Sequence, residues 1–451
     1  MFVMQRPGAS GFVAAIAGGL MVFASTQALA VPSFAVQTGM PCSACHVGGF
    51  GPQLPPLGRQ FKLEGYTMRA GDSFTVPFSA MAVASFLHTQ SDQAEPPAPH
   101  YGVNDNVTLD QVSLFAAGGI GDHFGGFSQF TYDGVGRAFS WDNLDLRAVD
   151  HVTIGGSDVL IGASLNNAPG VQDIWNTMPA WGFPYTDSDL APAPAAGTIM
   201  AGALAQSTLG VSAYAWWDNS IYTEAGLYWT PAHGFLRAMG ADPDEGGGRI
   251  AGAAPYLRIA YQKDYGDQNF QFGAFGLFPS LYPGGDRSTG MSDRYADIGL
   301  DGTYQFMGTG ENIYEIQAIF THERQSLDAT YALEGSANAH NTLNDFRLDG
   351  SYYWHNEIGG SVQYFNTWGS TDAVLYGGSL TGTPDSSGVL FQIDGTPFGN
   401  EPSSLGPRFN LRVGIQYRIY AKFDGASTNY DGLGHNASDN NTLRIFAWLA
   451  L

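Results

Sequence analysis

Apolar and polar residues alternate along most of the chain after residue 75. In one such run, Leu144, Leu146 and Ala148 share one side, while Asp145 and Arg147 share the other. The same period of two recurs in the stretches 159–165, 209–215, 314–320 and 409–418. The 3.6-residue period of amphipathic helices is scarce there. The pattern therefore predicts an all-β fold.

The polar sides of these runs favour a barrel. They carry acids and arginines together, as expected for the wet interior of a barrel, although a soluble β-sandwich would also alternate. Large aromatic residues stand near predicted strand ends, at Trp217, Trp229, Trp354 and Trp368. This placement is typical of the aromatic girdles of outer-membrane barrels.

The connections between strands support a barrel more strongly. Short turns are predicted at 118–122, 155–157, 218–220, 265–267 and 355–356, and long connections at 89–106, 167–208, 231–253, 279–294 and 324–342. Short and long alternate, as periplasmic turns and external loops do in outer-membrane barrels. One weakly marked strand is expected near Leu375 or Val389. Alternation over 443–451 predicts a last strand that closes the ring, so we expect a transmembrane antiparallel β-barrel of about 16 strands.

Composition narrows the class further. Charged residues make up 13% of the chain, against about 25% in an average soluble protein. The 29 Phe, 22 Tyr and 9 Trp argue against disorder. After residue 30, no apolar run is long enough for a transmembrane helix. The formal charge of −22 argues against a nucleic-acid partner.

The first thirty residues have the pattern of a signal peptide. Arg6 precedes an apolar run, and Ala28-Leu29-Ala30 forms a small-x-small cleavage site. We expect cleavage before Val31 and export; a membrane anchor is the alternative. Residues 1–30 hold one Arg and no acid, so their loss would make the charge −23.

The only two cysteines form a motif with known chemistry. Cys42-Ser43-Ala44-Cys45-His46 is C-x-x-C-H, the attachment signature of a c-type haem. The two thiols are spaced to form thioethers with one haem, and His46 is placed to ligate its iron. A redox C-x-x-C or a disulfide beside a His is the alternative, but no βαβ context surrounds it. We expect one covalently bound c-type haem.

The haem segment is too short to fold without support. Residues 31–76 would form a small cytochrome c plug, and residues 77–451 the barrel that shelters it. Arg59, Lys62 and Arg69 are candidate partners for the haem propionates. The sixth iron ligand is left open. The candidates are Met40, Met68, Met81 and His88, and Met68 is named as the possible ligand.

A haem motif joined to a barrel resembles the fused monohaem cytochrome–porins of bacterial outer membranes, the outer-membrane iron oxidases. The local matches are 37–46, 58–66, 171–177 continued by 179–185, and 436–443 with the last strand. Two features depart from the family. The spacer Val47–Leu57 is rich in Gly and Pro rather than acidic and aromatic, and Leu57 stands where Phe is more usual.

The resemblance implies a function. Cys42 and Cys45 would be thioether sites and His46 an axial ligand, in a protein that oxidises extracellular Fe(II) and passes the electron to a periplasmic carrier. Acidic residues Asp242, Asp244 and Glu245, in a predicted external loop, could attract the cation. The alternatives are a haem-plugged porin or an electron conduit for a donor or acceptor other than iron.

Overall fold

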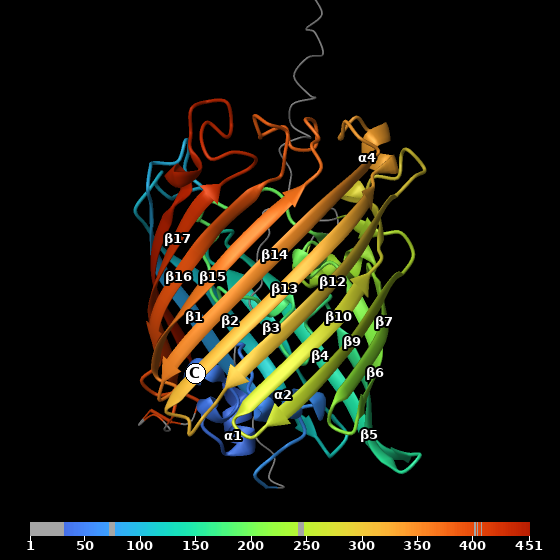
Figure 1. Cartoon of the computed structure of the whole chain (residues 1–451), viewed down its shortest axis with the longest axis vertical. Coiled ribbons are helices and arrows are strands. Elements are labelled where there is room, and N and C mark those ends of the chain that lie inside the picture. Colours follow the sequence, from blue (N-terminus) through green and yellow to red (C-terminus); the bar gives the residue numbers. More distant parts are fainter. Residues whose placement is uncertain (1–30, 72–76, 242–247, 401–402, 404, 407) are drawn as a thin grey trace, which may run out of the picture.

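The long strands form one closed antiparallel ring. The computed structural model describes residues 31–71, 77–241, 248–400, 403, 405–406 and 408–451. Strands that follow one another along the chain pair with one another, and β1 closes the ring by pairing with both β2 and β18 (Figure 1). The long strands are β1 (Phe78–Thr89), β2 (Asn106–Ile120), β3 (Phe124–Asp133), β4 (Ala138–Ile154), β5 (Ser157–Asn166), β6 (Leu209–Trp217), β7 (Ile221–Trp229), β9 (Ala254–Tyr265), β10 (Gln268–Leu277), β12 (Asp293–Phe306), β13 (Asn312–Ser326), β14 (His340–Trp354), β15 (Ile358–Gly369), β16 (Ser386–Gly395), β17 (Asn410–Lys422) and β18 (Thr442–Ala450).

Two of the eighteen strands in the described sheet are too short to cross the wall. β8 (Arg249–Ile250) and β11 (Ser280–Tyr282) pair with each other beside the ring. The remaining sixteen build the barrel, which confirms the predicted fold class. The weakly marked strand is β16, which contains Val389, whereas Leu375 lies in the connection before it.

The two faces of the wall differ as the alternation predicts. In β4, Asp145 and Arg147 are buried inside, while Leu146 is 42% exposed outside. Apolar side chains are exposed around the outer face, among them Leu114, Ile161, Val211, Leu257, Ile259, Phe272, Ile298, Leu300, Ile316, Val413, Ile415 and Ile445. A closed ring has no unpaired strand edge, and an apolar outer face is suited to lipid. This is the wall of an outer-membrane barrel, as predicted.

The two ends of the barrel carry different connections. At one end most strands are joined by tight turns, as between β6 and β7, where Asp218 and Asn219 have φ of 46° and 50°. Positive φ at both central residues is the turn geometry that matches strand twist. The other end carries long connections, as predicted. The exception at that end is the short β3–β4 connection, residues 134–137. The connection 396–409 is long at the short-turn end. Short turns identify the periplasmic end.

Two parts of the chain fill the lumen. The plug segment, residues 31–71, contains α1 (Pro32–Thr38), η1 (Cys42–Ala44), η2 (Val47–Gly49) and α2 (Pro56–Leu63), and α1 and α2 lie at the periplasmic end (Figure 1). The inward loop, residues 167–208, contains η3 (Pro179–Trp181) and η4 (Ile199–Ala201). The remaining short helices are α3 (His233–Ala238), η5 (Pro283–Gly285), α4 (Asp328–Ala332) and η6 (Ala437–Asn440).

The middle of the lumen is filled, which corrects the expectation of a wet interior there. The Arg147–Asp145 and Arg258–Asp301 ion pairs, both 2.9 Å long, have side chains with 0% exposure. The plug segment and the inward loop cover these charges, so they are paired with one another rather than with water. Alternation along a strand shows which face is polar, but not what covers it.

Some predictions fall outside the described residues. These are the signal peptide, residues 1–30, and the acidic group Asp242, Asp244 and Glu245. Among the described helices, none has the length and apolar character needed to span a bilayer.

Candidate cofactor site

The C-x-x-C-H motif forms a tight turn against the barrel. Cys42 begins the single turn η1, and the Cys45 N–H donates to the Cys42 carbonyl oxygen at 3.1 Å. The Ser43 N–H donates to the carbonyl oxygen of Gly399, in the β16–β17 connection, at 3.1 Å. The turn therefore presents both thiols from one small, anchored unit.

Asn356 and Arg412 fix the residues after the motif. The Asn356 amide nitrogen donates to the His46 carbonyl oxygen at 3.0 Å and to that of Ser43 at 3.3 Å, and its amide oxygen accepts the Gly48 N–H. Arg412 of β17 donates to the Gly48 carbonyl oxygen at 2.9 Å and is paired with Asp394 at 3.2 Å. The wall of the barrel thus determines the path of the plug segment.

Glycine is required where the plug segment meets these anchors. Gly48 has φ of +73°, and a Cβ there would lie 2.3 Å from the Arg412 guanidinium and 2.7 Å from the Tyr353 ring. Gly49 has φ of +70°, and a Cβ there would lie 2.7 Å from the Asn356 carbonyl oxygen and 2.9 Å from the Gly399 Cα. The glycine-rich spacer is therefore explained by close packing against the wall.

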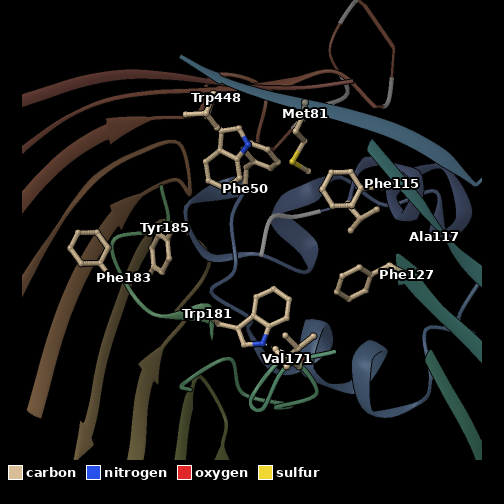
Figure 2. Packing of buried hydrophobic residues seen from close by; sticks show 14 of the residues in the cluster. Phe50, Met81, Phe115, Ala117, Phe127, Val171, Trp181, Phe183, Tyr185 and Trp448 are labelled. Carbon is tan, nitrogen blue, oxygen red and sulfur yellow. Dashed lines mark hydrogen bonds between the residues drawn. The ribbon is translucent and has the colours of Figure 1, made fainter. Parts of the chain in front are cut away.

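Cys42, Cys45 and His46 line one hollow, which we call the inner cavity. Its empty space, part of which is open to solvent, is about 820 Å³. Its walls come from the plug segment, the inward loop and strands β3 and β18. They are mainly apolar and aromatic, and include Phe34, Phe50, Leu54, Phe61, Tyr66, Phe127, Trp181 and Ala450. Figure 2 shows part of this packing, including Phe50 against Trp448, whose ring centroids are 4.4 Å apart.

The electrostatics of the motif suit a covalent metal-bearing group. Burial lowers the pKa of His46 to about 4, an effect that the Gly51 backbone opposes and the Arg412 charge assists. His46 is therefore neutral at pH 7, the form that binds metals. Its Nδ1 is buried and makes no hydrogen bond to a described residue. Burial, with a smaller effect from Cys42, raises the pKa of the Cys45 thiol to about 11, and burial raises that of Cys42.

The donors and the cavity together fit a c-type haem. Two thiols and a neutral imidazole face one apolar hollow, which is the donor set that such a haem uses. Gly58 permits close approach of α2 to the motif, because a Cβ there would lie 2.3 Å from the Cys45 carbonyl oxygen. The fit rests on the residues that line the hollow.

The candidate propionate partners lie in different places. Lys62 lines the inner cavity and donates to the Val171 carbonyl oxygen at 2.8 Å and to Asn176 at 2.9 Å. Arg59 does not line it; its guanidinium donates to Asn269 on the wall. Arg69 pairs with Asp122 at the periplasmic rim, at 2.6 Å. Arg408, which the sequence did not suggest, lines the cavity instead.

The sixth-ligand candidates are also separated. Met40 lines the inner cavity, whereas Met68 packs against the aromatic cluster without lining it. Met81 is buried on β1 and outside the lining. His88, at the other end of β1, lies 2.7 Å from Asp105. The geometry thus favours Met40 over Met68, the residue that sequence reasoning carried forward.

A second hollow, the outer vestibule, lies on the loop side of the lumen. Its volume is about 1870 Å³, and the inward loop and strands β14, β15 and β17 line it. Charged pairs stand on its walls: Arg347 with Asp345 at 3.1 Å, and Arg418 with Asp187 at 2.5 Å. Asp189 also lines it. Sequence reasoning found neither the vestibule nor the roles of Asn356, Arg412 and Trp181, because each depends on contacts distant in sequence.

Comparison with known proteins gives only fold likenesses. No protein-family model and no curated protein matches the chain. Among solved structures, an anion-selective porin from Comamonas acidovorans is 11% identical, with a TM-score of 0.45, covering 84% of this chain and 99% of that one. OprB of Pseudomonas putida is 12% identical, with a TM-score of 0.45, covering 83% and 93%. OmpT of Vibrio cholerae is 9% identical, with a TM-score of 0.44, covering 84% and 99%. The strand pairing described above, not these weak likenesses, establishes the porin-like barrel.

Proposed function

We propose that the chain transfers electrons across the outer membrane, oxidising extracellular Fe(II) at one covalently bound c-type haem and passing the electron to a periplasmic carrier. One observation carries this proposal: Cys42, Cys45 and His46 line a single apolar cavity inside the barrel, near its periplasmic end. A haem there would lie inside the ring of strands, with the outer vestibule on the loop side. The resemblance to the cytochrome–porin iron oxidases supports the same function.

Each residue of the cavity has a task. Cys42 and Cys45 would hold the haem through thioethers and neutral His46 would ligate its iron, and Met40 lines the same cavity. Lys62 and Arg408 are the cations of the lining, suited to carboxylate groups. A bound haem would supply one-electron redox chemistry, because haem iron alternates between the ferric and ferrous states.

The barrel also supports a second candidate, a channel whose lumen the haem segment plugs. A ring of sixteen strands is wide enough for an aqueous pore. The buried ion pairs of the middle lumen favour electron transfer over free passage of solutes, since a wet pore would expose them. A conduit for another donor would use the same cavity.

Purified protein mixed anaerobically with Fe(II) separates these candidates. Stopped-flow absorption should show the ferric haem becoming ferrous, over a range of pH. A soluble c-type cytochrome added afterwards should then be reduced. A haem that dithionite reduces but Fe(II) does not would leave the conduit for another donor. Steady ion conductance through the wild-type protein in a planar bilayer would favour the channel.

A further inference from the structure

The inner cavity and the outer vestibule are separated by one short piece of the inward loop. Ala180 and Gly182 line the vestibule, while Trp181, between them, lines the inner cavity. A Cβ on Gly182 would lie 3.7 Å from the Arg347 guanidinium, which places this backbone beside the charged vestibule wall. The partition is therefore a single residue thick at this point.

Trp181 is held rigidly in this position. Its indole N–H is shared between the carbonyl oxygens of Gly170, at 3.0 Å, and Val171, at 3.1 Å. Its backbone N–H donates to the Met178 carbonyl oxygen at 2.9 Å, and the side chain is only 6% exposed. The ring is thus fixed toward the inner cavity by bonds from its own loop (Figure 2).

The ring also belongs to an aromatic row that extends along the cavity. Its centroid lies 6.4 Å from that of Phe127, which lies 6.0 Å from Tyr66. Tyr66 stacks on Phe34 at 5.3 Å. The Lys62 ammonium nitrogen is 4.3 Å from the Trp181 ring centroid. A positive charge over an aromatic ring makes the ring harder to oxidise. Whenever Lys62 is protonated, the indole therefore favours tunnelling through it over oxidation to a resting radical.

We propose that Trp181 is the bridge through which electrons pass from a donor in the outer vestibule to the group held by Cys42, Cys45 and His46. This inference rests on the proposed function and gives a role to the segment 179–185. One Fe(II) in the vestibule becomes Fe(III), and one ferric haem iron becomes ferrous. No bond is made or broken and no proton moves. The ferric product forms outside the inner cavity.

The test compares Trp181→Leu with Trp181→Phe, which keeps an aromatic ring at the same place. Holoprotein carrying an affinity tag in an external loop is reconstituted in proteoliposomes. Vesicles whose long loops face outward are then enriched through this tag. Haem reduction is followed after adding Fe(II) or hexaammineruthenium(II), a small one-electron donor. The visible spectrum and midpoint potential of the haem are measured for each variant.

We expect Trp181→Leu to slow reduction by either outside donor by roughly tenfold, and Trp181→Phe to slow it far less. Spectrum and potential should match wild type, and the ruthenium donor sealed inside the vesicles should react equally fast with all three proteins. Three results for Trp181→Leu would overturn the bridging role: an unchanged rate of haem reduction by the outside donors, an equal slowing of reduction by outside and inside donors, or a change in midpoint potential large enough to account for the slowing. A different outcome is that hexaammineruthenium(II) reduces the wild-type haem and Fe(II) does not. If Trp181→Leu then slows that reduction, the bridging role of Trp181 is supported and the proposed oxidation of Fe(II) is refuted.

Discussion

The inner cavity and the outer vestibule are neighbours in one lumen, yet their walls have opposite character. Aromatic and aliphatic side chains dominate the inner cavity, and its thiols and imidazole are neutral. The vestibule is more than twice as large and carries the charged pairs of Arg347 and Arg418. The inward loop produces this difference by dividing the lumen. One side is mainly apolar and carries the thiols and the imidazole, and the other is lined by charged pairs.

The largest expected effect tests whether the inner cavity is a haem site. Changing both Cys42 and Cys45 to Ala should abolish haem staining of the protein on a denaturing gel, because no thioether can form. Ser43→Ala, a small change within the same turn, should keep the stain. Covalent haem in the double variant would refute the cofactor assignment.

The second prediction tests the close packing around the inner cavity. Gly48→Ala adds a Cβ 2.3 Å from Arg412 at a φ of +73°, and should destabilise the folded protein by about 2–4 kcal/mol. Urea unfolding in lipid vesicles measures this. Gly266→Ala is the matched control, since Gly266 has φ of +60° but open space around it. Equal losses in the two variants would show that backbone strain, not collision with the wall, is responsible.

The third prediction uses the buried amine of the inner cavity. Burial lowers the pKa of Lys62 to about 7, from 10.5 in the unfolded chain, while Asp145 partly opposes the shift. Between these values the unfolded chain binds more protons than the folded one, so the free energy of unfolding should rise with pH, by at most about 1.4 kcal/mol per pH unit. Lys62→Met should flatten the rise, and exposed Lys263→Met should not. A slope that survives Lys62→Met must come from other groups.

The smallest effect is expected in the vestibule. Burial, aided by nearby carboxylates, raises the pKa of Asp189 to about 7. At pH 8, where this carboxyl is mostly ionised, Asp189→Asn removes one negative charge from the vestibule wall without touching the inner cavity. Reduction by external Fe(II) should slow by about twofold at low ionic strength, and the difference should vanish in high salt. Asp122→Asn makes the same charge change at the periplasmic rim and should leave the rate unaltered. Equal effects of the two substitutions would indicate a response to net charge alone.

The fold was predictable because its signals are local. The period of two seen in Leu144–Ala148 depends only on the geometry of a strand, and the short turns depend on a few residues each. The haem motif is equally local, because its five residues are consecutive. The candidate ligands Met40 and Met68 could not be separated in this way. The number of residues between each methionine and the motif does not show which of them reaches the inner cavity.

By itself, the sequence determined the alternating strands, the approximate strand number and a C-x-x-C-H turn at the start of the described chain. Only the tertiary structure decided that the lumen is filled, that Lys62 rather than Arg59 reaches the inner cavity, and that Trp181 divides it from the vestibule. The physical reason is that the inward loop is irregular. Its course follows from hydrogen bonds to distant strands, such as those of Gln363 and Arg444, and not from any repeating pattern in its own residues.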